Sequence, residues 1–286
     1  MMFRAMREAG YRSAETAITE QFRERRLEIE RLRALSPLRR AILPPGTVLE
    51  IDRITSRIDA LLGHAPAPEV VAMLDDLAGQ LAAVVARAEA EAERIRRRPR
   101  ELPWPPAPTR FAFGTHRRTF SVERSFREQL RDAKEVREHG VGMLARLERD
   151  GKELVLVARG RATDNPVSPK RKIDCMLRTT APRGPGLHLE PRSMLRRLVP
   201  PRDAVAIEPA FDRAYVVKGN TPVVRALLDA GCRELLLSIA NEIRALWVGG
   251  GVIDLAWRRP FAKETVVLPD EALSIVTSIA ERLDAD

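Results

Sequence analysis

Cysteine is scarce in this sequence, which contains only Cys175 and Cys232. Neither has another cysteine or a histidine at the spacing of a metal-binding motif, and this argues against a zinc site. Each lies among apolar residues, where a free cysteine is usually a small buried hydrophobe. We therefore predict a reducing, cytoplasmic location.

Long apolar runs and aromatic residues are also missing. No stretch approaches eighteen consecutive apolar residues, so we expect no transmembrane helix. Met1–Gly10 has no apolar core of the kind that a secretory signal carries, so we expect no such signal. Aromatic residues make up only 5% of the chain, which counts mildly against a surface that stacks on nucleic-acid bases.

Recognisable catalytic and cofactor motifs are absent as well. The sequence contains no G-x-S-x-G, C-x-x-C, G-x-x-x-x-G-K-[ST] or G-x-G-x-x-G pattern. Its four histidines, which are His64, His116, His139 and His188, show no zinc-ligand spacing. The sequence thus predicts no catalytic residue, no cofactor and no metal site, and it favours a protein that is not an enzyme. An enzyme that assembles distant residues into an unfamiliar site stays open.

Basic residues, by contrast, are abundant and unevenly distributed. The net charge is +9, and residues 101–200 carry 21 basic and 12 acidic groups, whereas the two flanks cancel one another. Such an excess favours a polyanionic partner, either nucleic acid or an anionic membrane surface; solvated surface arginine is the alternative. The candidate polyanion-binding residues are Arg117, Arg118, Lys170, Arg171, Lys172, Arg192, Arg196 and Arg197.

Residues 1–100 have the periodicity of helices. Apolar side chains recur every three or four residues over 11–32, 51–61 and 70–95, the last with a heptad repeat. Thr47 is a plausible N-cap of the second helix. We predict an antiparallel helical bundle or coiled-coil arm that binds a protein partner, or a second copy of the chain, through residues 11–95. A bundle closed within one chain is an equally open alternative.

A proline-rich segment, 101–109, has the composition of a semi-rigid linker, and we place the main boundary there. The sequence pattern of residues 110–205 predicts a basic α+β portion. Its expected elements are a strand pair over 110–122, a helix over 125–138 with His139 at its C-terminal end, a hairpin across Asp150-Gly151, a strand over 173–179, a turn over 182–186, and a short helix capped by Ser193.

Residues 206–286 give the clearest succession of signals. Alternating residues predict a strand over 211–218, Thr221-Pro222 opens a helix that stops or kinks at Ala230-Gly231, and Gly249–Gly251 joins two strands. A last helix spans 268–283. This β-α-β-β-α module gives the second half an α+β fold with a mainly antiparallel sheet. It either continues the sheet of residues 110–205 or forms a separate one.

The strings F-D-R-A-Y-V-V-K-G-N-T-P, R-A-L-L and C-R-E-L-L within residues 208–260 resemble a module near the C-terminus of several uncharacterised bacterial protein families. The resemblance implies a fold and a bacterial origin. It implies no catalytic role, because those families offer no catalytic residues to match.

Taken together, the patterns favour a non-catalytic interaction or scaffold protein that assembles or docks through its helical arm. The alternative is a nucleic-acid-binding protein that uses a basic face on residues 110–200, although no helix-turn-helix, zinc-finger or RNA-binding signature is present.

Overall fold

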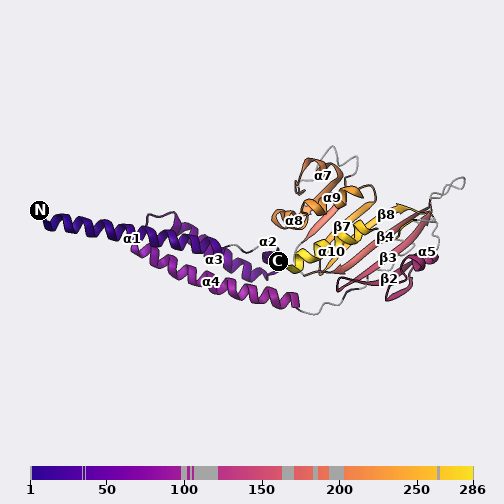
Figure 1. Ribbon diagram of the computed structural model, residues 1–286, viewed down its shortest axis with the longest axis horizontal. Coiled ribbons are helices and arrows are strands. Elements are labelled where there is room, and N and C mark those ends of the chain that lie inside the picture. The colour runs from indigo at the N-terminus through magenta and orange to yellow at the C-terminus, as the bar shows by residue number, and fades with distance from the viewer. Residues whose placement is uncertain are drawn as a thin grey trace. The chain divides into compact units, whose positions relative to one another are not determined.

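A computed structural model describes residues 2–33, 35, 37–97, 102–103, 105, 122–162, 171–182, 186–192, 203–262 and 265–285. The chain divides into two compact units, Met1–Arg97 and Arg98–Asp286 (Figure 1). The first unit is helical, and the second combines helices with one sheet, so the fold is α+β. Of the predicted linker 101–109, the described residues are Leu102, Pro103 and Pro105.

The first unit consists of helices, as the apolar periodicity predicts. Proline begins three of them, because the first helical N–H needs no partner within the helix. The predicted cap at Thr47 is wrong, since the second long helix begins two residues earlier and Pro44 stands at its N-cap. The helices are α1 (Met2–Leu32), α2 (Pro37–Ile42), α3 (Pro45–Leu62) and α4 (Pro68–Arg97).

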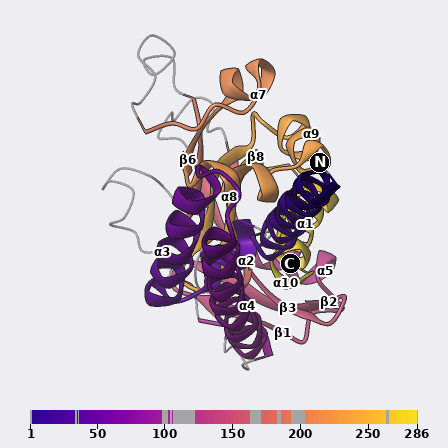
Figure 2. The ribbon, with the colours of Figure 1, turned by 90° about the vertical axis from the view of Figure 1, so that its left-hand side faces the viewer.

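The predicted stripes of these helices pack against one another. Ile54 and Ile58 of α3 and Leu74 and Leu81 of α4 are buried in one core, which Ile29 of α1 joins. Figure 2 shows α1, α3 and α4 nearly end-on. Ion pairs such as Arg33–Asp59 (2.8 Å) and Arg25–Asp75 link the helices at the surface. The coiled-coil arm itself stays a prediction.

The second unit contains an eight-stranded sheet in the order β1-β2-β3-β4-β8-β7-β5-β6, in which all neighbours are antiparallel. Because β4 pairs with β8, the two predicted α+β portions share one sheet, which decides between the alternatives left open. The strands are β1 (Glu135–His139), β2 (Gly142–Arg149), β3 (Lys152–Ala162), β4 (Arg171–Thr180), β5 (Leu187–Pro191), β6 (Tyr215–Gly219), β7 (Ile243–Gly249) and β8 (Val252–Pro260).

One face of this sheet is covered by the last helix. α10 contacts β4 and β8, and Figure 1 shows it lying across the sheet. Its stripe of Ile275, Val276 and Ile279 is completely buried, as are Leu177 of β4 and Leu255 of β8. The helices of this unit are α5 (Glu123–Gln129), α7 (Pro209–Ala214), α8 (Thr221–Leu227), α9 (Ala230–Ser238) and α10 (Asp270–Ala285).

Both glycine-containing hairpins are confirmed. Asp150 and Gly151 have φ values of 51° and 73°, and Gly250 and Gly251 have φ values of 62° and 90°. These positive angles match the turn whose twist suits two antiparallel strands. The local sequence is therefore enough to predict β2–β3 and β7–β8.

The predicted strand over 211–218 is wrong in its first half. Pro209 begins a helical turn, α7, and the side chain of Asp212 accepts a hydrogen bond from the backbone N–H of Ile207 at 3.1 Å. The extended backbone starts only at Tyr215, whose ring packs 5.0 Å from that of Phe211. A proline that begins a helical turn and a side-chain hydrogen bond to the preceding backbone thus outweigh the alternating pattern.

The predicted helix over 125–138 is also wrong beyond residue 129. The Gln129 side chain is held by the backbone of Thr265 and Val267 at 2.7 Å each, at the point where α5 ends. Residues 135–139 form strand β1 instead, which pairs with β2. The predicted strand pair 110–122 and the helix after Ser193 lie outside the described residues, apart from Val122.

Candidate anion-binding face of the sheet

The sequence-predicted basic set is only partly within the described residues. Arg171 and Lys172 begin β4, and Arg192 follows β5. The strand registers bring all three to one end of the sheet, with β8 and β7 between them. The Arg192 guanidinium donates to the Asp212 backbone oxygen at 2.6 Å and so holds α7. Outside the described residues lie Arg117, Arg118, Lys170, Arg196 and Arg197.

The alternation of the strands creates a second, charged face. In β4 the residues Ile173, Cys175, Leu177 and Thr179 are buried, whereas Asp174 and Arg178, which alternate with them, point to the opposite side of the sheet. We call this side the polar face. The strand registers align eight of the residues that define it across β3, β4, β8 and β7, and Arg244 joins them from the irregular start of β7. The eight are Arg159, Arg161, Lys172, Asp174, Arg178, Trp247, Asp254 and Arg258.

Asp174 lies at the centre of a group of arginines. Its Oδ2 accepts a hydrogen bond from Arg161 at 2.9 Å and lies 3.6 Å from Arg159, and its Oδ1 accepts from Arg258. Burial tends to raise the Asp174 pKa, but the hydrogen bonds and charges of Arg258 and Arg161 outweigh burial and lower it. The carboxylate is therefore charged at neutral pH.

Arg244 joins this group through an irregularity in β7. The register shifts between Ile243 and Ala245, and such a bulge re-aims a side chain. Burial and the nearby charge of Arg258 lower the pKa of Arg244, against the opposing effect of Asp174. We call Arg159, Arg161, Arg244 and Arg258 the arginine cluster.

Burial and like charge both act on the arginine cluster. Burial lowers the Arg159 pKa, and the charge of Arg258 lowers it further, although Asp174 opposes both. Arg258 has the same effect on Arg244. An anion placed beside Arg244 and Arg258 relieves this repulsion and forms charge-assisted hydrogen bonds with guanidinium groups.

An exposed aromatic residue lies on the same face. Trp247 of β7 is 46% exposed, and it is directly opposite Asp254 of β8. The His188 ring of β5 lies 5.6 Å from it, with the two planes inclined by 59°. Sequence reasoning missed this residue because it weighed the small number of aromatics rather than their positions.

The polar face also holds a fork-shaped ion pair. Arg178 donates two hydrogen bonds of 2.6 Å to the Asp254 carboxylate and a third, of 3.3 Å, to the Pro103 backbone oxygen. Leu102 packs with buried residues of β2 and β3 on this side. Residues 102 and 103 are thus fixed to the sheet, and the Arg178–Asp254 pair is a structural part of the face.

His139 has a different role from the predicted one. It ends strand β1 rather than a helix, so the helix-dipole interpretation was wrong. Its Nε2 lies 3.0 Å from the Pro105 backbone oxygen. The residue therefore helps to hold the segment before the sheet.

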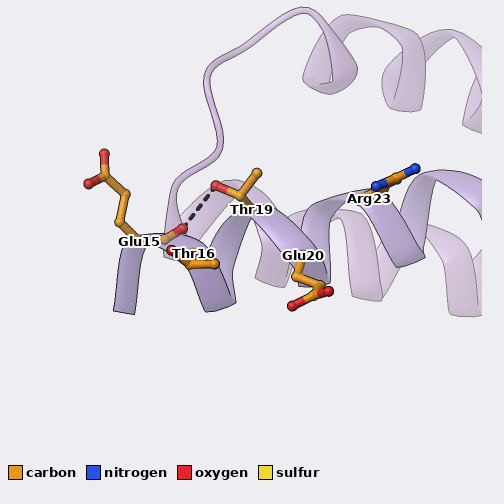
Figure 3. Close-up of a pocket in the computed structure, with 5 residues that line it drawn as sticks. All are labelled: Glu15, Thr16, Thr19, Glu20 and Arg23. Carbon is orange, nitrogen blue, oxygen red and sulfur yellow. Dashed lines mark hydrogen bonds between the residues drawn. The ribbon is translucent and has the colours of Figure 1, made fainter. Parts of the chain in front are cut away.

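Two of the surface hollows that the described residues form lie elsewhere. One, on α1, is bordered by exposed Glu15 and Glu20, and Figure 3 shows the hydrogen bond of 2.9 Å from Thr19 to the Glu15 backbone. The other lies between α9 and α10 and includes Cys232. Burial raises the pKa of Cys232 to about 11, so its thiol is protonated at neutral pH and is a weak nucleophile.

Neither a metal-binding group nor a membrane span is found in the part of the chain that the structure describes. In that part, no three histidine, cysteine, aspartate or glutamate side chains come together in a way that could hold a metal ion. Among the same residues, no helix combines the length and the apolarity that crossing a bilayer requires.

No protein-family model and no curated protein matches the chain. One solved structure with a similar arrangement is the crystal structure of the mycobacterial trehalose monomycolate transport factor A, TtfA. The similarity has 12% sequence identity and a TM-score of 0.30, and it covers 49% of this chain and 70% of that one. A similarity of this size carries no argument about function. The resemblance of residues 208–260 to uncharacterised bacterial families stays a prediction.

Proposed function

We propose that this protein is a non-catalytic interaction protein that binds nucleic acid on the polar face of its sheet. The observation that carries the proposal is the arginine cluster, in which Arg159, Arg161 and Arg258 surround the Asp174 carboxylate and Arg244 lies near them. Phosphate groups are the anions that arginine recognises best, because the planar guanidinium donates two parallel hydrogen bonds to them. A cytoplasmic location belongs to the same proposal.

The layout of the positive groups favours an extended ligand over a single small anion. Lys172, Arg258 and Arg244 stand on the successive strands β4, β8 and β7. Adjacent strands are about 4.8 Å apart, and Lys172 lies opposite Pro260, two residues beyond Arg258, so these groups form a diagonal row across the sheet. A nucleic-acid backbone presents phosphates in such a row, and interactions with them give affinity without sequence selection.

The test is binding of the purified, nuclease-treated full-length protein to labelled RNA and DNA across a salt series. The site variant is Lys172→Ala/Arg244→Ala, which leaves the ion pairs of Asp174 in place. We expect the affinity of the wild type to fall steeply with salt. We expect the variant to bind about tenfold more weakly and to show a smaller salt slope, by about 1 for each phosphate that it no longer binds.

The matched control is Arg124→Ala/Lys134→Ala, which removes the same charge. Arg124 is 92% exposed on α5, and the Lys134 side chain is 62% exposed just before β1 at the far edge of the sheet. We expect the control to bind almost as the wild type does. Equal decreases in affinity in both variants, or no binding by the wild type at low salt, would contradict the proposal.

A second candidate function is self-association through the helical arm, in the manner of a coiled coil. It is favoured by the large apolar side chains that three helices expose: Leu27 is 52% exposed on α1, Leu49 is 67% exposed on α3 and Met73 is 57% exposed on α4. Light scattering should give an apparent molecular mass that rises with protein concentration. The double variant Leu49→Ser/Met73→Ser should have a lower apparent mass than the wild type at the same concentration. A strict monomer at high concentration argues against this function.

A further inference from the structure

On the polar face, the indole ring of Trp247 forms a flat aromatic surface that rests on the backbone of its own strand. Gly249 lies two residues after Trp247 on the same side of β7. A Cβ atom at Gly249 would lie only 3.4 Å from the Trp247 Nε1, so the indole lies back over this glycine. With Trp247 46% exposed, much of the indole remains open to a ligand.

His188 supports the indole from the side. It is the register partner of Trp247 on β5, and the two ring centroids are 5.6 Å apart. Aromatic pairs at such separations attract one another. The indole is thus held by a strand backbone and by a neighbouring ring, and its orientation is fixed before any ligand arrives.

The supported indole is close to the arginine cluster. Arg244 precedes Trp247 by three residues on β7, which corresponds to about 10 Å of strand. The intervening Ala245 pairs with Ala256 of β8. Both of these side chains are small, so this register pair places no bulky side chain between Trp247 and Arg244. On the neighbouring strand β5, the acidic Glu190 follows His188 by two residues and therefore lies on the same side of the sheet.

We propose that the polar face binds single-stranded nucleic acid, with one base stacked on Trp247 and neighbouring phosphates bound by Arg244 and Arg258. This inference rests on the nucleic-acid binding proposed above and narrows it to unpaired strands. In a duplex, each base is covered by its neighbours and cannot stack on a side chain, whereas an unpaired base presents its whole face.

The first experiment compares ligands with and without bases. The full-length protein and its Trp247→Ala and Trp247→Phe variants are titrated with a uridine dodecamer, with a duplex of the same length and with inorganic polyphosphate. We expect Trp247→Ala to weaken dodecamer binding about tenfold, Trp247→Phe to keep most of it, and polyphosphate binding to be the same for all three. The wild type should bind the dodecamer more tightly than the duplex.

The second experiment observes the indole directly. The chain has three tryptophans, Trp104, Trp247 and Trp257, and Trp257 is 1% exposed. In a Trp104→Phe variant, Trp247 is therefore the accessible fluorophore. We expect the dodecamer to quench its fluorescence and polyphosphate to leave it nearly unchanged. Far-ultraviolet circular dichroism verifies that each variant is folded.

The outcomes separate the two proposals. If polyphosphate and the dodecamer bind the wild type, but the dodecamer neither quenches nor depends on Trp247, the stacking inference fails and the polyanion-binding function stands. A duplex that binds more tightly than the single strand also overturns the inference. If no polyanion binds the wild type, the proposed function fails together with the inference.

Discussion

At the scale of single residues, Asp174 holds the polar face together. It accepts hydrogen bonds from Arg161 and Arg258 and lies close to Arg159. Its own side chain is 21% exposed, and that of Arg159 is 5% exposed. Charges that are this deeply buried are tolerated because a partner of opposite sign is present. Removing the carboxylate leaves the guanidinium groups to repel one another.

We therefore predict that Asp174→Ala lowers the free energy of unfolding by about 3 kcal/mol at neutral pH, which is typical when one partner of a buried ion pair is removed. Urea unfolding followed by tryptophan fluorescence measures this change in the second unit, because all three tryptophans lie within Arg98–Asp286. Asp150→Asn is the matched control: the residue is exposed and has a φ of 51°, which asparagine tolerates.

The same carboxylate makes stability depend on pH. The pKa of Asp174 is lowered in the folded protein, so its contribution is fully present above the unfolded pKa of about 3.9. The contribution disappears as the pH falls through the folded pKa. We expect Asp174→Asn to lose less stability than the wild type between pH 5 and acid conditions, as measured by the same urea titrations. Parallel pH profiles for the two proteins would refute this expectation.

Only part of the candidate site can be predicted at this scale. Sequence reasoning relied on adjacent cations such as Lys170, Arg171 and Lys172. The arginine cluster consists instead of two residues on β3 and one each on β7 and β8, which meet only when the strands pair. The spacing of these arginines in the sequence does not predict that they are close in space, because strand pairing depends on the fold of the whole sheet.

At the scale of elements, local signals predict local structures. Asp150-Gly151 and Gly250-Gly251 adopt the positive φ angles that their hairpins need, and the proline-opened helices form where expected. The failures at α7 and β1 share a cause, since side chains hydrogen-bond to the backbone there and end or begin an element. Strand β5 was not predicted at all, because its five residues take their partners from β6 and β7, far along the chain.

The start of α9 offers a test of such a local interaction. One oxygen of Asp229 accepts a hydrogen bond from the Cys232 backbone N–H at 2.8 Å, and the other accepts from Arg282 of α10 at 2.5 Å. We predict that Asp229→Ala lowers the free energy of unfolding by about 1–2 kcal/mol, because it removes both the cap and the ion pair.

Asp229→Asn separates the two contributions, because its amide oxygen can still cap the helix. We expect Asp229→Asn to lower the free energy of unfolding by less than about 1 kcal/mol. The Asp229 and Arg282 side chains are 48% and 25% exposed, and water screens such a pair. Urea titrations of both variants measure the difference. Equal destabilisation by the two substitutions would mean that the cap contributes little.

At the scale of the whole molecule, each compact unit has its own core. The helical core contains buried residues from Ile29 to Ala92, and every strand pairing of the sheet lies within Arg98–Asp286. The division into a helical and a mixed unit could be anticipated from the change of periodicity along the chain. The eight-stranded sheet could not be anticipated, because no local sequence pattern predicts that β4 pairs with β8.

We predict that a fragment of residues 98–286 folds by itself. Its tryptophan fluorescence should show one cooperative urea transition with a midpoint close to that of the full-length protein, since no strand of the sheet is removed. The far-ultraviolet circular dichroism of the fragment should show less helix. A fragment without a cooperative transition would mean that the sheet needs the helical unit in order to fold.

The pairing of β4 with β8 has a consequence for synthesis of the chain on the ribosome. Strands β2, β3 and β4 emerge early and can pair at once. The other edge of β4 remains unpaired until β8 (Val252–Pro260) has been synthesised. An unpaired strand edge is a template for pairing with other chains. The nascent protein therefore passes through a period of vulnerability to aggregation. A message that stops before Val252 should give an insoluble product rather than a working fragment.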